Sequence, residues 1–320
     1  MSDTPLEIGL TPWLFDDGNL SAGFAAQAER AEALGFHSIF IPEHHFAPGA
    51  IPAPLLLLAV AAARTKTLRL GTTSYLLPLR HPLHAAAEVA VLDRVSEGRV
   101  ILGVGRGFRK ATLAAFDVAP AEKRDRFEAV LAAMCEAWAG KPVVFEDGES
   151  GPPAVLAPLP VQKPHPPIWL AAFGPKALAQ AGRLALPYLA SPMEPLSKLD
   201  ENLTRYREAC DAAGCEPPAE VPIMRTVFIG DGVAALARVS AALESQMRAL
   251  AKAPSATLRS RMALAEVDDW AIVGEPAAVS DRIAALRERF GMTHLIVRAQ
   301  IPGVDPADIE ASLDRIAGLR

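Results

Sequence analysis

The feature that most constrains this chain is a regular alternation of short apolar runs with amphipathic helical stretches. Residues 7–13, 37–42 and 99–105 have the length and composition of buried strands, and each is followed by helical spacing of apolar residues. The whole chain contains eight such strand-then-helix units. Strands that are apolar on both faces and separated by helices predict a parallel sheet covered by helices.

Eight units of this kind close most naturally into a (β/α)8 barrel, the TIM-barrel fold, with its active site in the loops after the strands. We therefore expect an α/β fold with one barrel domain over residues 1–320, and an open doubly wound sheet is the alternative. Residues 140–166 and 252–273 are expected to be insertions, the second a candidate lid.

Charge and cysteine content exclude several classes of partner. The formal net charge of -5 leaves no basic footprint for nucleic acid, and no apolar run approaches the 18 residues of a membrane span. No secretory leader is visible at the start of the sequence. The three cysteines lack CxxC spacing, which favours a reduced, cytoplasmic setting.

The segment Glu43-His44-His45-Phe46 directly follows the second expected strand, where barrel chemistry is found. Neighbouring side chains on an extended backbone point to opposite faces, so His44 and His45 are not expected to share one target. One histidine would face a pocket while the other is packed or solvated, and Glu43 could orient His44 or bind backbone. No metal site is expected here.

Two further strand ends suggest anion binding. Three glycines surround Arg106 after the fourth strand, which lets the backbone and the guanidinium approach a ligand closely. After the fifth strand, Gly174 and Pro175 fit a helix start, where free N–H groups and the helix dipole favour an anion and Lys176 adds positive charge. A plain glycine turn and a purely structural helix cap are the alternatives.

These motifs together resemble those of the bacterial luciferase-like, flavin-dependent monooxygenases. The resemblance rests on "EHHF", "LPLRHPLHAAAEVAVLDRVSEGRVILGVGRGF" and "PIWLAAFGPKALAQAGR", and it extends from the first strand to the eighth. It implies an eight-stranded barrel that binds reduced FMN at the carboxyl ends of the strands, often as a dimer.

The resemblance also assigns roles to individual residues. His44 matches the catalytic histidine beside the flavin, and Arg106 and Arg124 match arginines that contact the FMN phosphate. Thr73–Ser74 falls at the position of a non-prolyl cis peptide against the flavin ring. The sequence departs from luciferase at Gly105, where luciferase has a reactive cysteine. Cofactor contacts after the fifth strand are expected from Phe173, Gly174 and Lys176.

The resemblance therefore implies an FMN-dependent monooxygenase that oxygenates a small apolar molecule such as an aldehyde or ketone. Because no dinucleotide fingerprint is present, a separate flavin reductase is expected to supply reduced FMN. The alternatives are a reductase or dehydrogenase that uses a deazaflavin coenzyme on the same barrel, and a flavin-binding relative without activity. The expected pocket walls are Trp13, Phe46, Tyr75, Phe108 and Met193.

Overall fold

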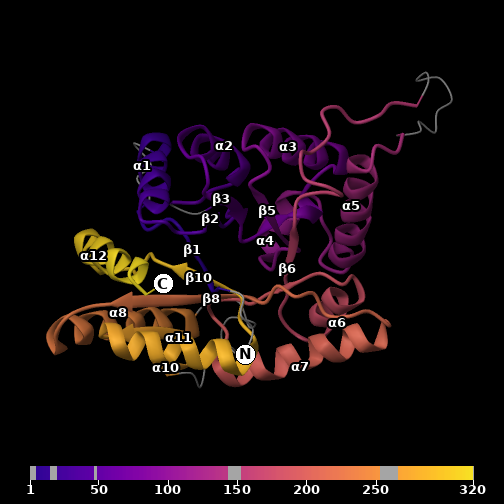
Figure 1. Ribbon diagram of the computed structural model, residues 1–320. Coiled ribbons are helices and arrows are strands. Elements are labelled where there is room, and N and C mark those ends of the chain that lie inside the picture. The colour runs from indigo at the N-terminus through magenta and orange to yellow at the C-terminus, as the bar shows by residue number, and fades with distance from the viewer. Residues whose placement is uncertain (1–4, 15–19, 47–48, 143–152, 253–265, 320) are drawn as a thin grey trace. The chain divides into compact units, whose positions relative to one another are not determined.

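A computed structural model describes residues 5–14, 20–46, 49–142, 153–252 and 266–319 (Figure 1). The chain divides into two compact units. The first combines residues 1–40 with residues 169–320, and the second comprises residues 41–168. Each unit is built from parallel strands and the helices that connect them, which agrees with the α/β class predicted from the alternating pattern.

The first unit contains a parallel β-sheet in which each strand pairs with its neighbour. In this sheet β2 pairs with β1, β1 with β10, β10 with β8, and β8 with β9. A second pair joins β6 to β7, and Ala190, just after β7, forms a parallel bridge to Ile223 of β8. The strands are β1 (Glu7–Leu10), β2 (Ser38–Ile41), β6 (Ile168–Ala171), β7 (Tyr188–Leu189), β8 (Pro222–Ile229), β9 (Ala271–Gly274) and β10 (His294–Arg298).

Helices follow most of these strands, as a parallel arrangement requires. The helices of the first unit are α1 (Leu20–Ala33), α6 (Pro175–Arg183), α7 (Leu196–Ala212), α8 (Val233–Ala251), α10 (Val267–Trp270), α11 (Pro276–Phe290) and α12 (Pro306–Ala317). Helix α6 packs closely along α7. At this contact a Cβ on Gly182 would lie 2.6 Å from Cβ of Ala209 and 2.8 Å from the Cys210 backbone nitrogen, so only glycine fits.

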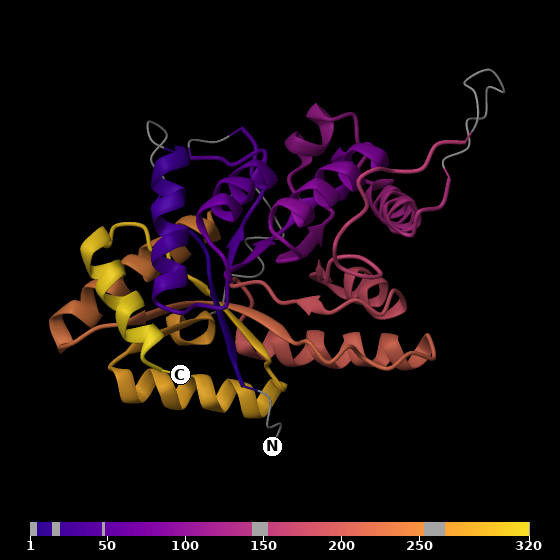
Figure 2. The ribbon, with the colours of Figure 1, turned by 45° about the horizontal axis from the view of Figure 1, so that its top comes forward.

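The second unit contains β3 (Arg69–Thr72), β4 (Tyr75–Leu76) and β5 (Val100–Gly105), and both β3 and β4 pair in parallel with β5. Its helices are α2 (Pro54–Arg64), η1 (Leu77–Leu79), α3 (Pro82–Val95), α4 (Lys110–Ala115) and α5 (Lys123–Trp138). Helix α3 lies beside α5, as Figure 2 shows. The Trp138 indole, at the end of α5, donates a hydrogen bond to the Ala86 carbonyl of α3 at 2.9 Å.

The expected insertion at 252–273 is wrong at its C-terminal end. Residues 271–274 form β9, a strand of the sheet in which Thr226 and Ala271 are register partners. The apolar run there extends only from Trp270 to Val273, too short to be separated from loop sequence by its pattern. The remainder of the candidate lid falls largely on residues outside the described part of the chain.

The C-terminal half of the other expected insertion, 140–166, is hydrogen-bonded to α3 of the second unit. The fully buried carboxylate of Asp93 accepts hydrogen bonds from the backbone nitrogens of Val161 and Gln162, at 2.7 and 2.9 Å. It also accepts one from the Gln162 side chain at 2.7 Å.

Among the described residues, no helix is both long and apolar enough to cross a membrane.

Replacing Gly182 by alanine should destabilise the protein, although alanine favours helix. The added methyl would collide with the α7 backbone, and overpacking of this kind costs about 1–3 kcal/mol. Gly23→Ala in α1 is the matched control, because a Cβ at that position would meet nothing within 4 Å apart from its chain neighbours and the helix's own backbone. This control should raise the unfolding free energy by about 0.5–1 kcal/mol. Urea unfolding of both variants measures the difference, and equal changes would contradict the packing argument.

Candidate functional site

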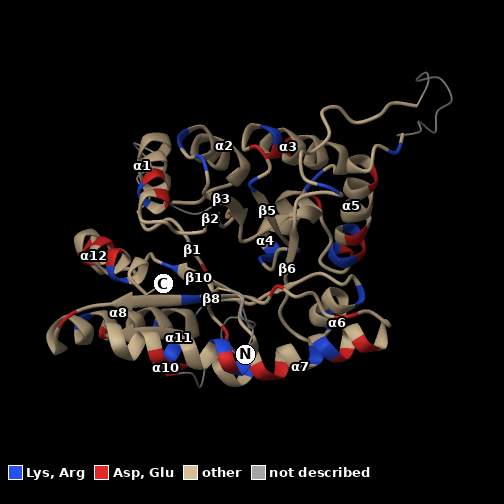
Figure 3. Ribbon diagram, viewed as in Figure 1, with Lys and Arg blue, Asp and Glu red and all other residues tan. Residues whose placement is uncertain are grey.

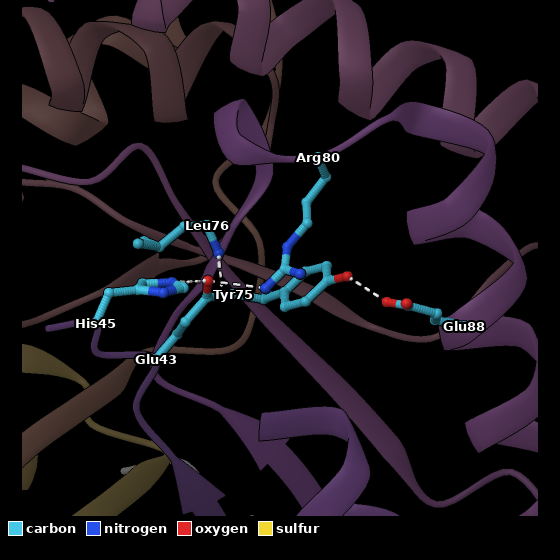
Figure 4. A network of polar contacts seen from close by, with 6 residues as sticks. All are labelled: Glu43, His45, Tyr75, Leu76, Arg80 and Glu88. Atoms are coloured by element: carbon cyan, nitrogen blue, oxygen red, sulfur yellow. Dashed lines mark hydrogen bonds and ion pairs between the residues drawn. The ribbon is translucent and has the colours of Figure 1, made fainter. Parts of the chain in front are cut away.

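The carboxylate of Glu43, just after β2, is the centre of a buried polar network (Figure 4). Its Oε1 accepts hydrogen bonds from His45 Nε2 at 2.7 Å and from Arg80 Nη2 at 2.8 Å. Its Oε2 accepts from the backbone nitrogen of Leu76 at 2.9 Å. The side chain of Glu43 is fully buried, so both oxygens depend on these partners. Glu43 thus holds the segment after β2 to β4 and to the loop before α3.

Arg80 extends this network towards α3. Its guanidinium lies over the ring of Tyr75, 4.4 Å from the centroid, and the Tyr75 hydroxyl donates a hydrogen bond to Glu88 at 2.8 Å. Burial acts to lower the pKa of Arg80, but Glu43, Tyr75 and Glu88 together outweigh it and raise that pKa. Burial, reinforced by the two carboxylates, raises the pKa of Tyr75 well above its usual range. Tyr75 is therefore a neutral hydrogen-bond donor and Arg80 a permanent cation.

His44 and His45 point to different surroundings, as their alternation predicts. The ring of His45 is buried against Glu43 and lies 5.0 Å, centroid to centroid, from the ring of Phe116. His44 is exposed. Desolvation by the atoms around it, and then the positive charges of Arg109 and His45, lower the pKa of His44 below its ordinary value. An accessible imidazole that is neutral near pH 7 can accept a proton, which is the first requirement for a general base.

The peptide bond between Thr73 and Ser74 is cis, as the resemblance led us to expect. It separates β3 from β4. Gly105, at the end of β5, lies against this turn, and a Cβ at that position would overlap the Ser74 hydroxyl oxygen. A side chain at residue 105 would therefore require the Ser74 side chain to move.

Three cations gather between the end of β5 and the start of α5. Burial, followed by the charge of Arg124, lowers the pKa of Arg106 to about 10. Burial and then the charges of Arg106 and Arg124 lower the pKa of Lys123, whose ammonium donates a hydrogen bond to the Gly107 carbonyl at 3.1 Å. Figure 3 shows basic segments around α4 and the start of α5. A bound anion would relieve the repulsion among these cations.

The remaining predicted cofactor residues lie in the other unit. Gly174, with φ of 85°, precedes α6, and Pro175 occupies the first helical position, as predicted. The residue that would cap this helix has no side chain, so no side-chain hydrogen bond closes its N-terminus. Lys176 is exposed and Phe173 is partly exposed. In the first turn of α6, the backbone nitrogens of Ala177 and Leu178 donate hydrogen bonds to the Gly174 carbonyl, at 3.0 and 3.1 Å.

The aromatic residues near the strand ends differ in exposure. Phe46 and Phe108 are 70% and 50% exposed, so apolar surface is accessible after β2 and after β5. Tyr75, in contrast, is buried within the Glu43 network. Trp13 is buried in the first unit, where its backbone nitrogen donates to Gln27 at 2.8 Å. Of the expected wall residues in the second unit, Phe46 and Phe108 thus present a surface to a ligand.

Arg80 and Lys123 were not among the predicted site residues. Arg80 lies in the segment "LPLRHPLH", but its partner Glu43 is 37 residues away, and no periodic pattern connects the two. Lys123 directly precedes Arg124, so the adjacent basic pair is the signal that could have found it.

Comparison with known proteins identifies the family of the chain. The profile of the luciferase-like monooxygenases matches residues 16–294. The chain belongs to this family. A solved monooxygenase from Streptomyces bottropensis is 30% identical, with a TM-score of 0.81 and 98% of each chain covered. The chain spans about half the length of the first curated relatives that it matches.

Two more solved structures share the fold at lower identity. The oxygenating constituent of 3,6-diketocamphane monooxygenase from Pseudomonas putida, in complex with FMN, is 23% identical with a TM-score of 0.82. The match covers 98% of this chain and 97% of the other. A coenzyme F420-dependent secondary alcohol dehydrogenase is 19% identical, with a TM-score of 0.74 and 98% of each chain covered.

Replacing Glu43 by glutamine should destabilise the second unit. The variant leaves Arg80 partly buried without its carboxylate, and breaking a buried ion pair from one side costs about 3–5 kcal/mol. The control is Glu244→Gln, which removes an exposed pair with Arg248 and should change stability by less than about 0.5 kcal/mol. Chemical unfolding of both variants provides the comparison. Equal effects would mean that Glu43 does not organise this region.

Proposed function

We propose that this protein is a flavin-dependent monooxygenase that uses reduced FMN and dioxygen to oxygenate a small apolar molecule. The observation that carries the proposal is the combination, within one unit, of an exposed imidazole of lowered pKa with a cluster of three cations. The imidazole suits proton transfer, and the cluster of cations suits binding of a phosphate group. Membership of the luciferase-like monooxygenase family supports joining these two features in one reaction.

His44 is the proposed catalytic residue. When FMN is bound it supplies the redox chemistry, and the protein contributes orientation, exclusion of water and proton transfer. The His44 imidazole is neutral because desolvation and the charges of Arg109 and His45 lower its pKa. The backbone nitrogen of His44 donates to the Ile51 carbonyl at 2.9 Å, and His45 is held by Glu43. His44 is thus accessible while its backbone is fixed.

The proposed phosphate site consists of Arg106, Lys123 and Arg124. Charge-assisted hydrogen bonds to phosphate are stronger than neutral ones, and arginine engages two oxygens at once. Thr73 and Ser74 are proposed to lie against the flavin ring, as the resemblance implies. Phe173, Gly174 and Lys176 remain proposed cofactor contacts, because of that resemblance and because no side chain caps the helix that starts after Gly174.

Several finer features are proposed with this function. Because the similar diketocamphane protein is an oxygenating constituent, we propose that a separate reductase supplies reduced flavin. The substrate would be an aldehyde, ketone or similar molecule, which suits the exposed rings of Phe46 and Phe108. We also propose a single, closed eight-stranded barrel domain, a homodimer, and a cytoplasmic location in keeping with three free cysteines.

The second candidate function is hydride transfer with a deazaflavin coenzyme. The similar fold of the F420-dependent alcohol dehydrogenase favours this function. So does the helix start at Gly174, because this segment resembles the phosphate segment of relatives that use the deazaflavin coenzyme. The third candidate function is flavin binding without activity, which would not require an accessible neutral imidazole. The greater identity to a monooxygenase over the full chain supports the oxygenase.

Lys123→Gln should weaken binding of FMN and leave binding of riboflavin, which lacks the phosphate, nearly unchanged. The expected loss is about 1.5–3 kcal/mol, the range for a hydrogen bond to a charged group. Lys110→Gln is the control, an exposed lysine at the start of α4. Fluorescence titration with both flavins measures the effect. A similar loss for riboflavin would remove Lys123 from the phosphate site.

His44→Gln should leave flavin affinity within about tenfold while oxygenation of a competent substrate falls by roughly 100- to 10,000-fold, as for a lost acid–base group. The measurement is oxygen uptake and product formation with reduced FMN and a panel of aldehydes and ketones. His84→Gln, on the first turn of α3, is the control. Unchanged product formation would remove His44 from the reaction, and hydride transfer without oxygen uptake in the wild type would favour the deazaflavin alternative.

A further inference from the structure

The turn that ends α7 brings two cysteines together. The backbone nitrogen of Cys215 donates a hydrogen bond to the Cys210 carbonyl at 3.1 Å, and that of Gly214 donates to the Asp211 carbonyl at 3.0 Å. With Gly214 at a φ of 69°, this is the Schellman motif that closes many helices. The motif folds the residue after the glycine back over the last helical turn, so the side chains of Cys210 and Cys215 become neighbours.

The sulfur atoms of this pair are in contact. The thiols of Cys210 and Cys215 are hydrogen-bond partners, and both cysteines are free. The Cys215 Sγ also lies 3.4 Å from the Cys210 carbonyl oxygen and 3.3 Å from the Gly182 carbonyl oxygen of α6. A direct backbone hydrogen bond between the two residues is compatible with the Cα separation of roughly 4.4–6.8 Å that a disulfide requires.

The two thiols differ in their access to solvent. Cys210 is completely buried, whereas Cys215 is partly exposed. Burial raises the pKa of the Cys210 thiol, and a hydrogen bond with Tyr206 only partly offsets this effect. Because buried thiols are poorly reactive towards reagents in solution, an oxidant meets Cys215 first. Cys210 needs no access of its own for a second step, because it is already in contact with Cys215.

We propose that Cys210 and Cys215 are a reversible oxidation site that closes to a disulfide in the presence of hydrogen peroxide. The Cys215 sulfur attacks one peroxide oxygen, the O–O bond breaks, and a sulfenic acid and one water are formed. The Cys210 sulfur then attacks the Cys215 sulfur, and the hydroxyl group leaves with the Cys210 proton as a second water. The pair loses two electrons and two protons, and the peroxide is reduced to two waters.

Oxidation of this pair changes one contact between α6 and α7. A disulfide sulfur carries no hydrogen, so Cys215 can no longer donate to the Gly182 carbonyl. That carbonyl still accepts from the backbone nitrogen of Ala185 at 3.0 Å, so it keeps a partner after the disulfide forms. The fold therefore tolerates both states of the pair, as a transient disulfide in a reducing compartment requires.

The oxidation site is independent of the proposed oxygenase function. Its residues all belong to the first unit, and its chemistry needs neither flavin nor substrate. Hydrogen peroxide is also the by-product of a reduced flavin that reacts with dioxygen when no substrate is present. The test supplies the peroxide directly, so its outcome does not depend on flavin binding.

The test treats the flavin-free full chain with hydrogen peroxide and then labels the remaining thiols with N-ethylmaleimide in denaturant. Trypsin releases both cysteines of the pair in one peptide, residues 208–225, and Cys135 in another. We expect the 208–225 peptide to lose both labels together, with no singly labelled form accumulating, and to regain both after treatment with dithiothreitol. Burial raises the pKa of Cys135, which should keep its label.

Three variants make the result specific. Cys135→Ser is the matched control and should leave the paired loss of label unchanged. In Cys215→Ser, the buried Cys210 should keep its label at a peroxide concentration that closes the wild-type pair. In Cys210→Ser, the Cys215 sulfenic acid should persist and be trapped by dimedone, which should not label the wild-type pair once it has closed.

The wild-type protein alone decides the question if a variant fails to fold. Loss of only one label, loss of both that dithiothreitol does not reverse, or a covalent dimer through Cys215 would each overturn the proposal. So would equal oxidation of Cys135, or no loss of label at all, which would mean that the two cysteines only pack against each other.

Discussion

The buried carboxylate of Glu43 is the interaction on which the candidate site depends. A carboxylate without solvent must have all its charge balanced by fixed partners, and Glu43 takes its partners from three separate places. Arg80 supplies the charge, Leu76 a backbone N–H, and His45 a ring nitrogen. By holding His45, Glu43 settles which of the two adjacent histidines is buried. His44, which lies between Glu43 and His45 in the sequence, is exposed.

This arrangement separates structural from reactive groups in a short segment. Arg80 and Tyr75 lie in low-dielectric surroundings that fix their protonation, whereas the pKa of His44 is lowered so that the ring is neutral. Arg106 and Lys123 are the reverse case, because burial and the neighbouring positive charges lower the pKa of each. A phosphate would offset that repulsion with a compact negative charge and several acceptor oxygens.

Much of this could be predicted from the sequence because it is local. Two-residue alternation distinguished His44 from His45, and apolar periodicity placed the strand before them. The helix start at Gly174 followed from the order of glycine and proline. What escaped prediction depends on contacts between distant residues. Glu43 meets Arg80 across 37 positions, Asp93 meets Gln162 across 69, and β9 is recognisable as a strand only through its pairing with β8.

The most direct test of the account is an anaerobic calorimetric titration of the purified protein with reduced FMN and, separately, with the reduced deazaflavin coenzyme. The cationic cluster and the family membership predict saturable binding of reduced FMN, tighter than that of the deazaflavin coenzyme by more than tenfold, or about 1.4 kcal/mol. Binding of the deazaflavin coenzyme alone, or of neither compound, would contradict the assignment of this site to FMN.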